Sequence, residues 1–352
     1  MANTSLIRTP SSTGNRKTFT FSAWFKKASI GAIGNLFSQY AGSGSGADKH
    51  FRIRFNTNDT IGVAAFSTDI LVTNRVFRDV SSWYHVVLAV DTTQSTEADR
   101  VKLYINGDQI TDFSSTSYPT QNYDYAVNTA SYPIRLGADD SDGNGPYGWF
   151  DGCMSHVHLT DGAAYAASTF GSTDATTGEW QINTSPSVTY GTNGFFMFKD
   201  DNSLSDDSGQ GNNFTLVGGN FTKTEDNPSN NFATLNPLIN PDVGNRSTYT
   251  NGNTKGNTTS AGHISGISTM AVSEGKYYCE SKSGSSGSGH VFGVIQANKN
   301  IKGTDPQDFS GLYGVSANGT RYVAGTQTGS WGGSYTYNNV MGLALDMDAS
   351  PT

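Results

Sequence analysis

The fold is decided by residues 18–25, which read Thr18-Phe19-Thr20-Phe21-Ser22-Ala23-Trp24-Phe25. Successive side chains of a β-strand point to opposite faces of its sheet. As a strand, this stretch places its phenylalanines on one face and its hydroxyl-bearing residues on the other. Such alternation is typical of a sheet whose two faces meet different surroundings.

Other segments with strand character recur at short intervals along the chain. Residues 83–91 are long and strongly apolar, as expected of a central strand, and residues 101–110 form a hairpin around Asn106-Gly107. Only residues 163–170 favour a helical turn. The remaining predicted strands span residues 50–55, 132–136, 149–159, 194–198, 262–270, 275–281, 290–296, 311–315, 320–323 and 341–346.

Length and composition agree with an all-β protein. The chain has 352 residues, of which 41 are glycine and only 15% are charged, and its length suggests about two domains. Short strands separated by turn residues indicate β-sandwiches. The Asn- and Pro-rich residues 223–241 favour a linker, because proline lacks a ladder donor. We therefore predict two tandem antiparallel β-sandwiches, at residues 1–222 and 242–352.

Charge and hydropathy exclude several classes of function. The net charge of −8 disfavours nucleic-acid binding, which depends on neutralising phosphates. No apolar stretch approaches the length of a membrane-spanning helix, and residues 1–5 lack a signal-peptide pattern. We expect a protein made in a cytoplasm without Sec export. Cys153 and Cys279 lie in different predicted domains, so we expect reduced thiols.

The first predicted domain resembles laminin-G-like, concanavalin A-like jelly rolls. The stretches that carry this resemblance are residues 19–27, 83–91, 103–107, 149–157 and 206–214. Three further stretches are similar to virion proteins of tailed, marine-type bacteriophages, namely residues 8–16, 90–104 and 226–238. The resemblance implies a jelly roll over about residues 5–217, a virion location after synthesis in the host cytoplasm, and other virion proteins as partners.

The second predicted domain resembles a SPRY-type sandwich. Residues 275–280, Gly-Lys-Tyr-Tyr-Cys-Glu, are similar to a strand of that family, with Cys279 where tryptophan is usual. Residues 340–348 resemble a later strand, after which a SPRY domain continues with a further hairpin. The sequence stops at Thr352. We therefore expect a SPRY-like sandwich whose C-terminal part is missing from this sequence. Either a longer parent chain supplies that part, or a partner protein completes the sandwich.

Catalytic patterns are absent from the sequence. Concanavalin A-like glucanases need two carboxylates on one strand face, whereas the glutamates here are isolated. No Gly-x-Ser-x-Gly elbow occurs in a hydrolase-like context. His156 and His158 would share a strand face and could bind a transition metal, although packed or surface histidines are the preferred interpretation. We predict that the protein is not an enzyme.

Calcium is the one cofactor that the sequence suggests. Asp140, Asp142, Asn144 and Asp151 match four positions of a calcium-binding loop, which supplies several oxygen ligands around a sharp glycine turn. The flanks are predicted strands rather than helices, so a solvated hairpin loop is the alternative. The acidic residues 200–207 are a second candidate, because some laminin-G-like domains hold calcium at their rim.

Loop aromatics suggest ligand binding, because a sugar ring packs well on an aromatic face. The candidates are Tyr123, Tyr125, Tyr147, Trp331 and Tyr335, with core packing as the alternative. The functional hypothesis is a non-enzymatic virion protein of a tail fibre, spike or head appendage that presents loops to a host-surface glycan or protein. The alternatives are a structural decoration or adaptor protein and a polysaccharide depolymerase. Fibres are usually trimeric, but no heptads indicate trimerisation here, and oligomeric state stays open.

Overall fold

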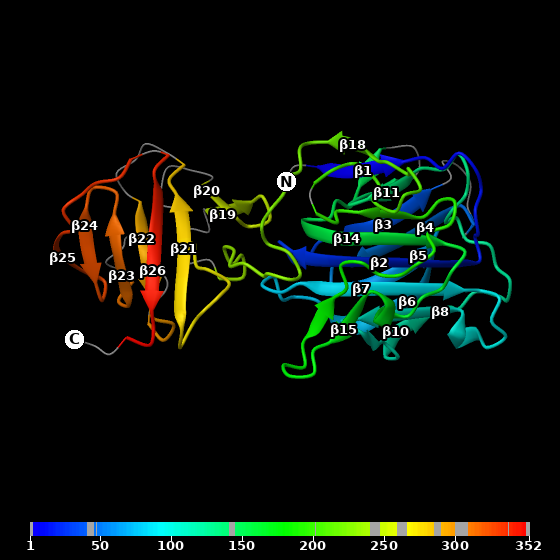
Figure 1. The fold of residues 1–352 in the computed structure, drawn as a ribbon, viewed down its shortest axis with the longest axis horizontal. Helices are drawn as coiled ribbons and strands as arrows, with labels where there is room; N and C mark the ends of the chain where they lie inside the picture. Colours follow the sequence, from blue (N-terminus) through cyan, green and yellow to red (C-terminus); the bar gives the residue numbers. More distant parts are fainter. Residues whose placement is uncertain are drawn as a thin grey trace. The chain divides into compact units, whose positions relative to one another are not determined.

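The computed structural model describes residues 3–40, 46, 48–140, 145–200, 202–239, 247–258, 266–284, 290–299, 309–336 and 338–349. They divide into a first unit, Met1–Phe232, and a second unit, Ala233–Thr352 (Figure 1). The described residues form antiparallel sheets and two short 3-10 turns, η1 (Glu97–Asp99) and η2 (Ala167–Thr169). The all-β prediction is therefore confirmed.

Two large sheets build the first unit. The eight-stranded sheet has the order β10 (Phe113–Thr116), β6 (Thr68–Val76), β5 (Thr60–Ala65), β4 (His50–Phe55), β3 (Gly34–Tyr40), β11 (Ile134–Leu136), β1 (Thr4–Arg8) and β18 (Thr215–Gly218). The six-stranded sheet has the order β17 (Phe195–Met197), β14 (Gly152–Asp161), β2 (Thr18–Lys27), β7 (Tyr84–Asp91), β8 (Val101–Ile105) and β9 (Asp108–Gln109). The predicted hairpin at Asn106-Gly107 joins β8 to β9.

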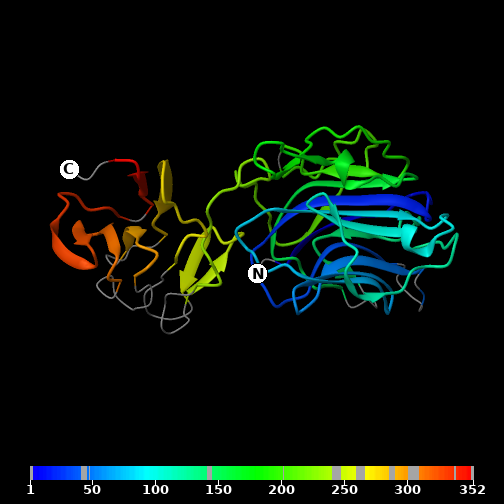
Figure 2. The ribbon, with the colours of Figure 1, turned by 90° about the horizontal axis from the view of Figure 1, so that it is seen from below.

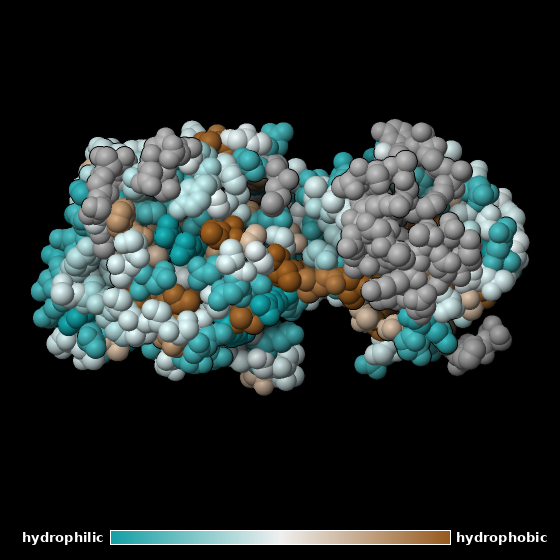
Figure 3. All heavy atoms as spheres, turned by 180° about the vertical axis from the view of Figure 1, so that it is seen from behind, coloured by the Kyte–Doolittle hydropathy of each residue, from teal (hydrophilic) through white to brown (hydrophobic). Residues whose placement is uncertain are grey.

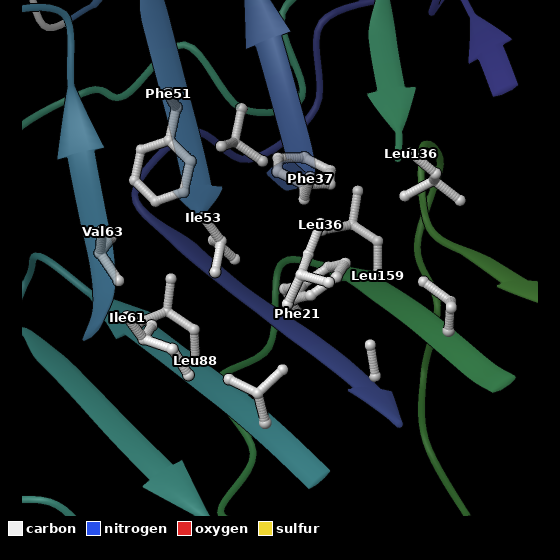
Figure 4. Packing of buried hydrophobic residues seen from close by; sticks show 14 of the residues in the cluster. Phe21, Leu36, Phe37, Phe51, Ile53, Ile61, Val63, Leu88, Leu136 and Leu159 are labelled. Carbon is white, nitrogen blue, oxygen red and sulfur yellow. The ribbon is translucent and has the colours of Figure 1, made fainter. Parts of the chain in front are cut away.

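The hydrophobic core lies between these two sheets (Figure 4). The phenylalanines of β2 contact rings of the opposite sheet, with centroids 5.6 Å apart for Phe19 and Phe51 and 5.2 Å apart for Phe21 and Phe37. All four side chains are fully buried. The alternation in residues 18–25 therefore predicts the inner face of β2 correctly.

The outer face of β2 is also buried, which the sequence pattern does not predict. Thr20, Ser22 and Trp24 have almost no exposed surface. Residues 162–193, called here the covering segment, lie over the six-stranded sheet (Figure 2). The covering segment contains η2 and a hairpin of β15 (Gly171–Thr173) and β16 (Trp180–Ile182). The polar alternation therefore marks a face that is covered by another part of the chain rather than by water.

A buried ion pair attaches residues 226–232 to the first unit. The Lys26 ammonium lies 2.7 Å from Asp226 Oδ2 and also donates to the carbonyl of Phe232. Trp83 Nε1 donates to the other carboxylate oxygen of Asp226 at 2.8 Å. These contacts give the buried lysine and aspartate partners, as buried charges require. The first ten residues of the predicted linker thus fall in the first unit, whereas residues 233–241 fall in the second.

The second unit is built from small antiparallel sheets. They are the pair β19 (Ser247–Thr250) and β20 (Lys255–Thr258), the pair β21 (Lys276–Lys282) and β26 (Val340–Asp346), and the four strands β22 (Val291–Ile295), β23 (Leu312–Ser316), β24 (Thr320–Val323) and β25 (Thr326–Ser330). The strands predicted near residues 275–281, 290–296 and 320–323 correspond to β21, β22 and β24. Among its described apolar side chains, only Ala317 and Tyr335 are buried.

The surface of the first unit is mostly hydrophilic or neutral on the face that Figure 3 shows, with small hydrophobic spots.

The remaining strands of this unit, β12 (Asp139–Asp140) and β13 (Pro146–Tyr147), form a short ladder on either side of the predicted calcium loop. Cys153 and Cys279 are free, as the sequence predicts.

We expect the Phe21→Ala substitution to lower the free energy of unfolding by about 3–5 kcal/mol, because it leaves a cavity between two close-packed sheets. Urea denaturation followed by tryptophan fluorescence would measure the change, since four of the five tryptophans lie in the first unit. Val76→Ala is the matched control: Val76 is 44% exposed, and its truncation should cost less than about 0.5 kcal/mol. Equal losses in both variants would contradict this account of the core.

Candidate functional site

The predicted calcium loop has one carboxylate that is already paired. Arg135 lies 2.8 Å from the Asp140 carboxylate, so a calcium ion would compete with a guanidinium for it. Asp142 and Asn144 lie outside the described residues. Asp151 is half-buried in the turn before β14. Within the described ranges, no group of three or more His, Cys, Asp or Glu side chains could hold a metal ion, and the calcium site stays a prediction.

The second acidic candidate is organised by backbone donors. The Asp206 carboxylate accepts hydrogen bonds from the backbone NH groups of Phe196, Ser208 and Asn212. Asp201 lies outside the described residues. The described part of this cluster therefore serves as a turn that joins β17 to the loop before β18.

Tyr147 helps to hold a buried carboxylate beside the predicted calcium loop. Asp139 accepts hydrogen bonds from the Tyr147 hydroxyl and from His50 Nε2, both at 2.8 Å, and Arg52 lies 3.2 Å away. Burial opposes ionisation of Asp139, but His50, Tyr147 and Arg52 outweigh it and lower its pKa to about 2. The Tyr147 hydroxyl thus has a structural partner.

Two of the other predicted ligand-binding aromatics are buried, which corrects their assignment. Tyr125 is 1% exposed and its ring packs on Phe19 and Phe51 in the core, because the loop that carries it folds inward. Tyr335 is 9% exposed, and its hydroxyl donates to the carbonyl of His290. Neither ring can stack on a ligand without unfolding its surroundings. Tyr123 is half-buried against Tyr125.

Trp331 is the most exposed of the predicted aromatics. Its side chain is 68% exposed in the loop after β25. Trp331 and Tyr335 lie in the second unit, whereas Tyr123, Tyr125 and Tyr147 lie in the first.

A buried serine–histidine pair lies on the outer face of the six-stranded sheet. Ser22 Oγ is 2.8 Å from His85 Nε2, and Trp180 Nε1 donates to His85 Nδ1 at 3.0 Å. An indole nitrogen can only donate, so Nδ1 of His85 must be the acceptor and the proton must sit on Nε2. His85 therefore donates to Ser22 and cannot take its proton. This tautomer excludes a general-base role for His85 toward Ser22.

The Cys153 thiol, near the same face, has a raised pKa. Cys153 lies on β14, and burial raises the pKa of its thiol to about 11. The thiolate is the reactive form of cysteine, so a raised pKa suppresses nucleophilic attack near neutral pH.

His156 and His158 lie on the same side of β14 but have separate partners. His158 Nδ1 is 2.9 Å from the Tyr190 hydroxyl, and His156 Nδ1 is 2.8 Å from Ser155 Oγ. His156 has a positive φ of 46° at a β-bulge, and both imidazoles pack on the ring of Phe196. Separate hydrogen-bond partners and a shared aromatic contact fit the packed-histidine interpretation rather than metal ligation.

The covering segment is attached to the six-stranded sheet through threonine hydroxyls. Thr20 and Thr160 both donate to the carbonyl of Ala163, at 2.9 and 2.8 Å. Tyr165 N then donates to Thr20 Oγ1, and the Tyr165 hydroxyl accepts from the backbone NH of Thr189. Hydrogen bonds therefore hold both the backbone and the hydroxyl of Tyr165.

A pocket of about 290 Å³ opens between the covering segment and strands β7 and β8. We call it the β7–β8 pocket; its lining residues are Ala89, Asp91, Gln94, Asp99, Lys102, Tyr104, Ala164, Tyr165 and Ala166. Three alanines provide the space, because their side chains end at Cβ. Tyr104 and Tyr165 supply aromatic surface, and the other four side chains supply polar groups. A second hollow of about 260 Å³ is lined by Glu179, Trp180, Gln181, Ile182, Pro228 and Ser229.

The polar groups of the β7–β8 pocket are held in place by neighbouring residues. The Asp91 carboxylate accepts hydrogen bonds from Thr93 and from Gln94 Nε2, and Lys102 Nζ lies 2.9 Å from Asp99. Burial opposes ionisation of Asp91, but the hydrogen bonds from Thr93 and Gln94 outweigh it and hold its pKa below the usual value. The side chains that line the pocket thus include two carboxylates, an ammonium and two phenol rings.

None of these nine residues was predicted from the sequence as a site residue. The pocket joins β7, β8 and a covering segment that is about 60 residues away along the chain, and no motif links them. The available signal was Ala163-Ala164-Tyr165-Ala166-Ala167, where small residues surround one tyrosine.

Residues 2–168 match the family model described as the concanavalin A-like lectin/glucanases superfamily. Over these residues the chain is therefore similar to concanavalin A-like jelly rolls, and the first unit is called the lectin fold domain below. No curated protein matches the sequence. No helix among the described residues is long and apolar enough to cross a membrane.

Several solved structures resemble this lectin fold domain at a distance. A heptameric SAP-like pentraxin from Limulus polyphemus is 15% identical, with 62% of this chain and 96% of that chain covered and a TM-score of 0.36. The CBM40 domain of a Ruminococcus gnavus sialidase, bound to α2,3-sialyllactose, is 20% identical, with 42% and 87% covered and a TM-score of 0.31. A leech intramolecular trans-sialidase is 15% identical, with 47% and 27% covered and a TM-score of 0.35.

We expect the lectin fold domain to lose stability as the pH falls from about 6.5 toward 4. Burial lowers the pKa of His85 to about 3 and of His156 to about 4, and it lowers the pKa of His158 well below 6.5. Histidines of the unfolded chain take up protons first, so the loss begins below their ordinary pKa of about 6.5. Below that pH, each histidine that stays neutral in the folded state lowers the free energy of unfolding by about 1.4 kcal/mol for each pH unit.

Urea denaturation at pH 7, 6 and 5 would measure this loss. The lowered pKa of Asp139 does not contribute in that window, because a depressed carboxyl pKa affects stability only below about pH 4. Imidazole NMR signals of these three histidines should not titrate above pH 5. A free energy of unfolding that is constant between pH 7 and 5 would show that these imidazoles are not buried in their neutral form.

Proposed function

We propose that the chain is a non-enzymatic, glycan-binding virion protein whose lectin fold domain holds a host-surface sugar in the β7–β8 pocket. The observation that carries this proposal is the meeting of two tyrosine rings with fixed carboxylates in one open hollow. Small-molecule sites combine aromatic lining with a few convergent polar groups in this way.

The chemistry of the pocket suits a sugar. The C–H face of a pyranose ring packs on a phenol ring, and Tyr165 is already fixed by its contacts with Thr20 and Thr189. Sugar hydroxyls donate to carboxylates, and such charge-assisted hydrogen bonds are stronger than neutral ones. A fixed pocket also reduces the ordering cost of binding.

Two features of the first unit argue against catalysis: the pKa of Asp91 in the pocket, and the tautomer of His85 outside it. Glycosidases of the usual kind need one carboxylic acid whose pKa is raised so that it can protonate the leaving group. The pKa of Asp91 is instead held low by Thr93 and Gln94. His85 carries its proton on the nitrogen that faces Ser22, so the serine has no base there. These features support binding without bond cleavage.

The virion part of the proposal rests on sequence resemblance. Residues 8–16 and 226–238 are similar to stretches of tailed-phage virion proteins, and residues 275–280 resemble a SPRY strand. In this proposal the lectin fold domain and a SPRY-like second domain form part of a tail fibre, spike or head appendage. Mass spectrometry of purified virions would detect the chain if it is a virion component, and its absence from them would remove that part of the proposal.

A structural decoration or adaptor role is the second candidate. Its support is three large exposed side chains of the second unit, Tyr278, Trp331 and Val340, which are 66%, 68% and 55% exposed. Protein interfaces are enriched in tyrosine and tryptophan relative to the rest of the surface. A virion reconstruction would separate the roles, because an adhesin keeps its β7–β8 pocket open to the outside, whereas an adaptor covers it.

We expect Tyr104→Ala to weaken glycan binding about fivefold or more, because truncation of an aromatic anchor costs at least about 1 kcal/mol. A glycan array with the full-length chain would find a ligand, and calorimetry would then measure the affinities of the wild type and the variant. Tyr104→Phe retains the ring and should bind more tightly than Tyr104→Ala.

Tyr278→Ala is the matched control, because Tyr278 is exposed in the second unit and outside the pocket. It should bind as the wild type does. Binding that survives Tyr104→Ala but is lost in Tyr278→Ala would place the glycan site in the second unit. Release of reducing ends from the bound glycan would contradict the non-enzymatic assignment.

A further inference from the structure

We infer, on the basis of the proposed function, that the β7–β8 pocket selects an uncharged sugar unit and discriminates against acidic sugars. The inference rests on the balance of charges that line the pocket and on how each charge is held. It names the class of ligand for the site and predicts a dependence on salt that a neutral pocket would not show.

Carboxylates outnumber cations in the lining. Asp91 and Asp99 face a single ammonium, that of Lys102, and the other six lining residues carry no charge. Lys102 Nζ is 2.9 Å from Asp99 Oδ1, so its charge is already used in an ion pair. The pocket therefore presents a net charge of −1 to a ligand.

The nearest additional cation in the sequence is directed elsewhere. Arg100 follows Asp99, but its guanidinium donates to the carbonyls of Gln94, Ser95 and Pro119. It thereby stabilises the loop around η1 rather than joining the lining. An arginine binds a carboxylate well, because its guanidinium can donate two parallel hydrogen bonds to it. None of the nine lining residues is an arginine.

The negative charge at Asp91 is stable near neutral pH. Its carboxylate accepts hydrogen bonds from Thr18, Thr93 and Gln94, which favour the ionised form. An acidic sugar would thus meet a permanent like charge at the end of β7. An uncharged sugar meets the same group as a strong acceptor for its hydroxyls.

The size of the pocket points to a single ring. At about 290 Å³ it lies at the lower end of the range for small-molecule sites, about 300–1,000 Å³. The unit that enters is therefore one monosaccharide, with the rest of the glycan outside. An acidic cap on the terminal sugar would bring its charge close to Asp91 and Asp99.

A matched pair of glycans tests the inference. One ends in an uncharged hexose, and the other is the same glycan capped by an acidic sugar. We expect the full-length chain to bind the acidic one about fivefold more weakly or worse at 20 mM salt, because like charges repel at short range. The difference should shrink at 500 mM salt, since Asp99 is 46% exposed and its charge is screened.

Asp99→Asn is the diagnostic variant. It removes one carboxylate and frees Lys102, so it should reduce the preference for the uncharged glycan about fivefold or reverse it. Asp108→Asn is the matched control, because Asp108 is an exposed acid on β9 outside the lining, and it should leave the preference unchanged. Equal or tighter binding of the acidic glycan by the wild type would overturn the inference and leave the proposed function standing. Binding of neither glycan, and of nothing else on the array, would instead remove the proposed function.

Discussion

The burial of β2 on both of its faces is the constraint on which the first unit depends. Its inner face supplies phenylalanines to the core between two sheets. Its outer face carries hydroxyl groups that would be costly to bury without partners. The covering segment provides partners for Thr20 through the carbonyl of Ala163 and the backbone NH of Tyr165, and His85 of β7 provides the partner for Ser22. Hydrogen bonds therefore contribute to holding the third layer on the sheet.

The covering segment also decides the chemistry of this face. Trp180 fixes the tautomer of His85, and burial keeps the three histidines of the face neutral. The proton of His85 is thereby placed on the nitrogen that faces Ser22. Where the segment leaves the sheet, three alanines and two tyrosines leave an open pocket beside β7 and β8. The covering segment thus buries the sheet surface around His85 and leaves the β7–β8 pocket accessible.

Much of the fold could be predicted from the sequence, because strand periodicity is local. The inner face of β2, the Asn106-Gly107 hairpin and the free thiols are all found in the structure. Individual site residues could not be predicted in this way. Tyr125 stands in a turn-rich stretch typical of a surface loop, yet it packs in the core. Asp140 fits a calcium motif, yet Arg135, five residues earlier, occupies its carboxylate.

The sequence alone determined that the chain forms β-sheets and which side of β2 faces the core, since side-chain alternation along a strand fixes its two faces. Only the tertiary structure decided what covers the polar side of β2 and which residues meet in the β7–β8 pocket. Those residues come from segments far apart in the chain. Their meeting depends on long-range packing and on hydrogen bonds from Thr20 and Thr160, which leave no periodic trace in the sequence.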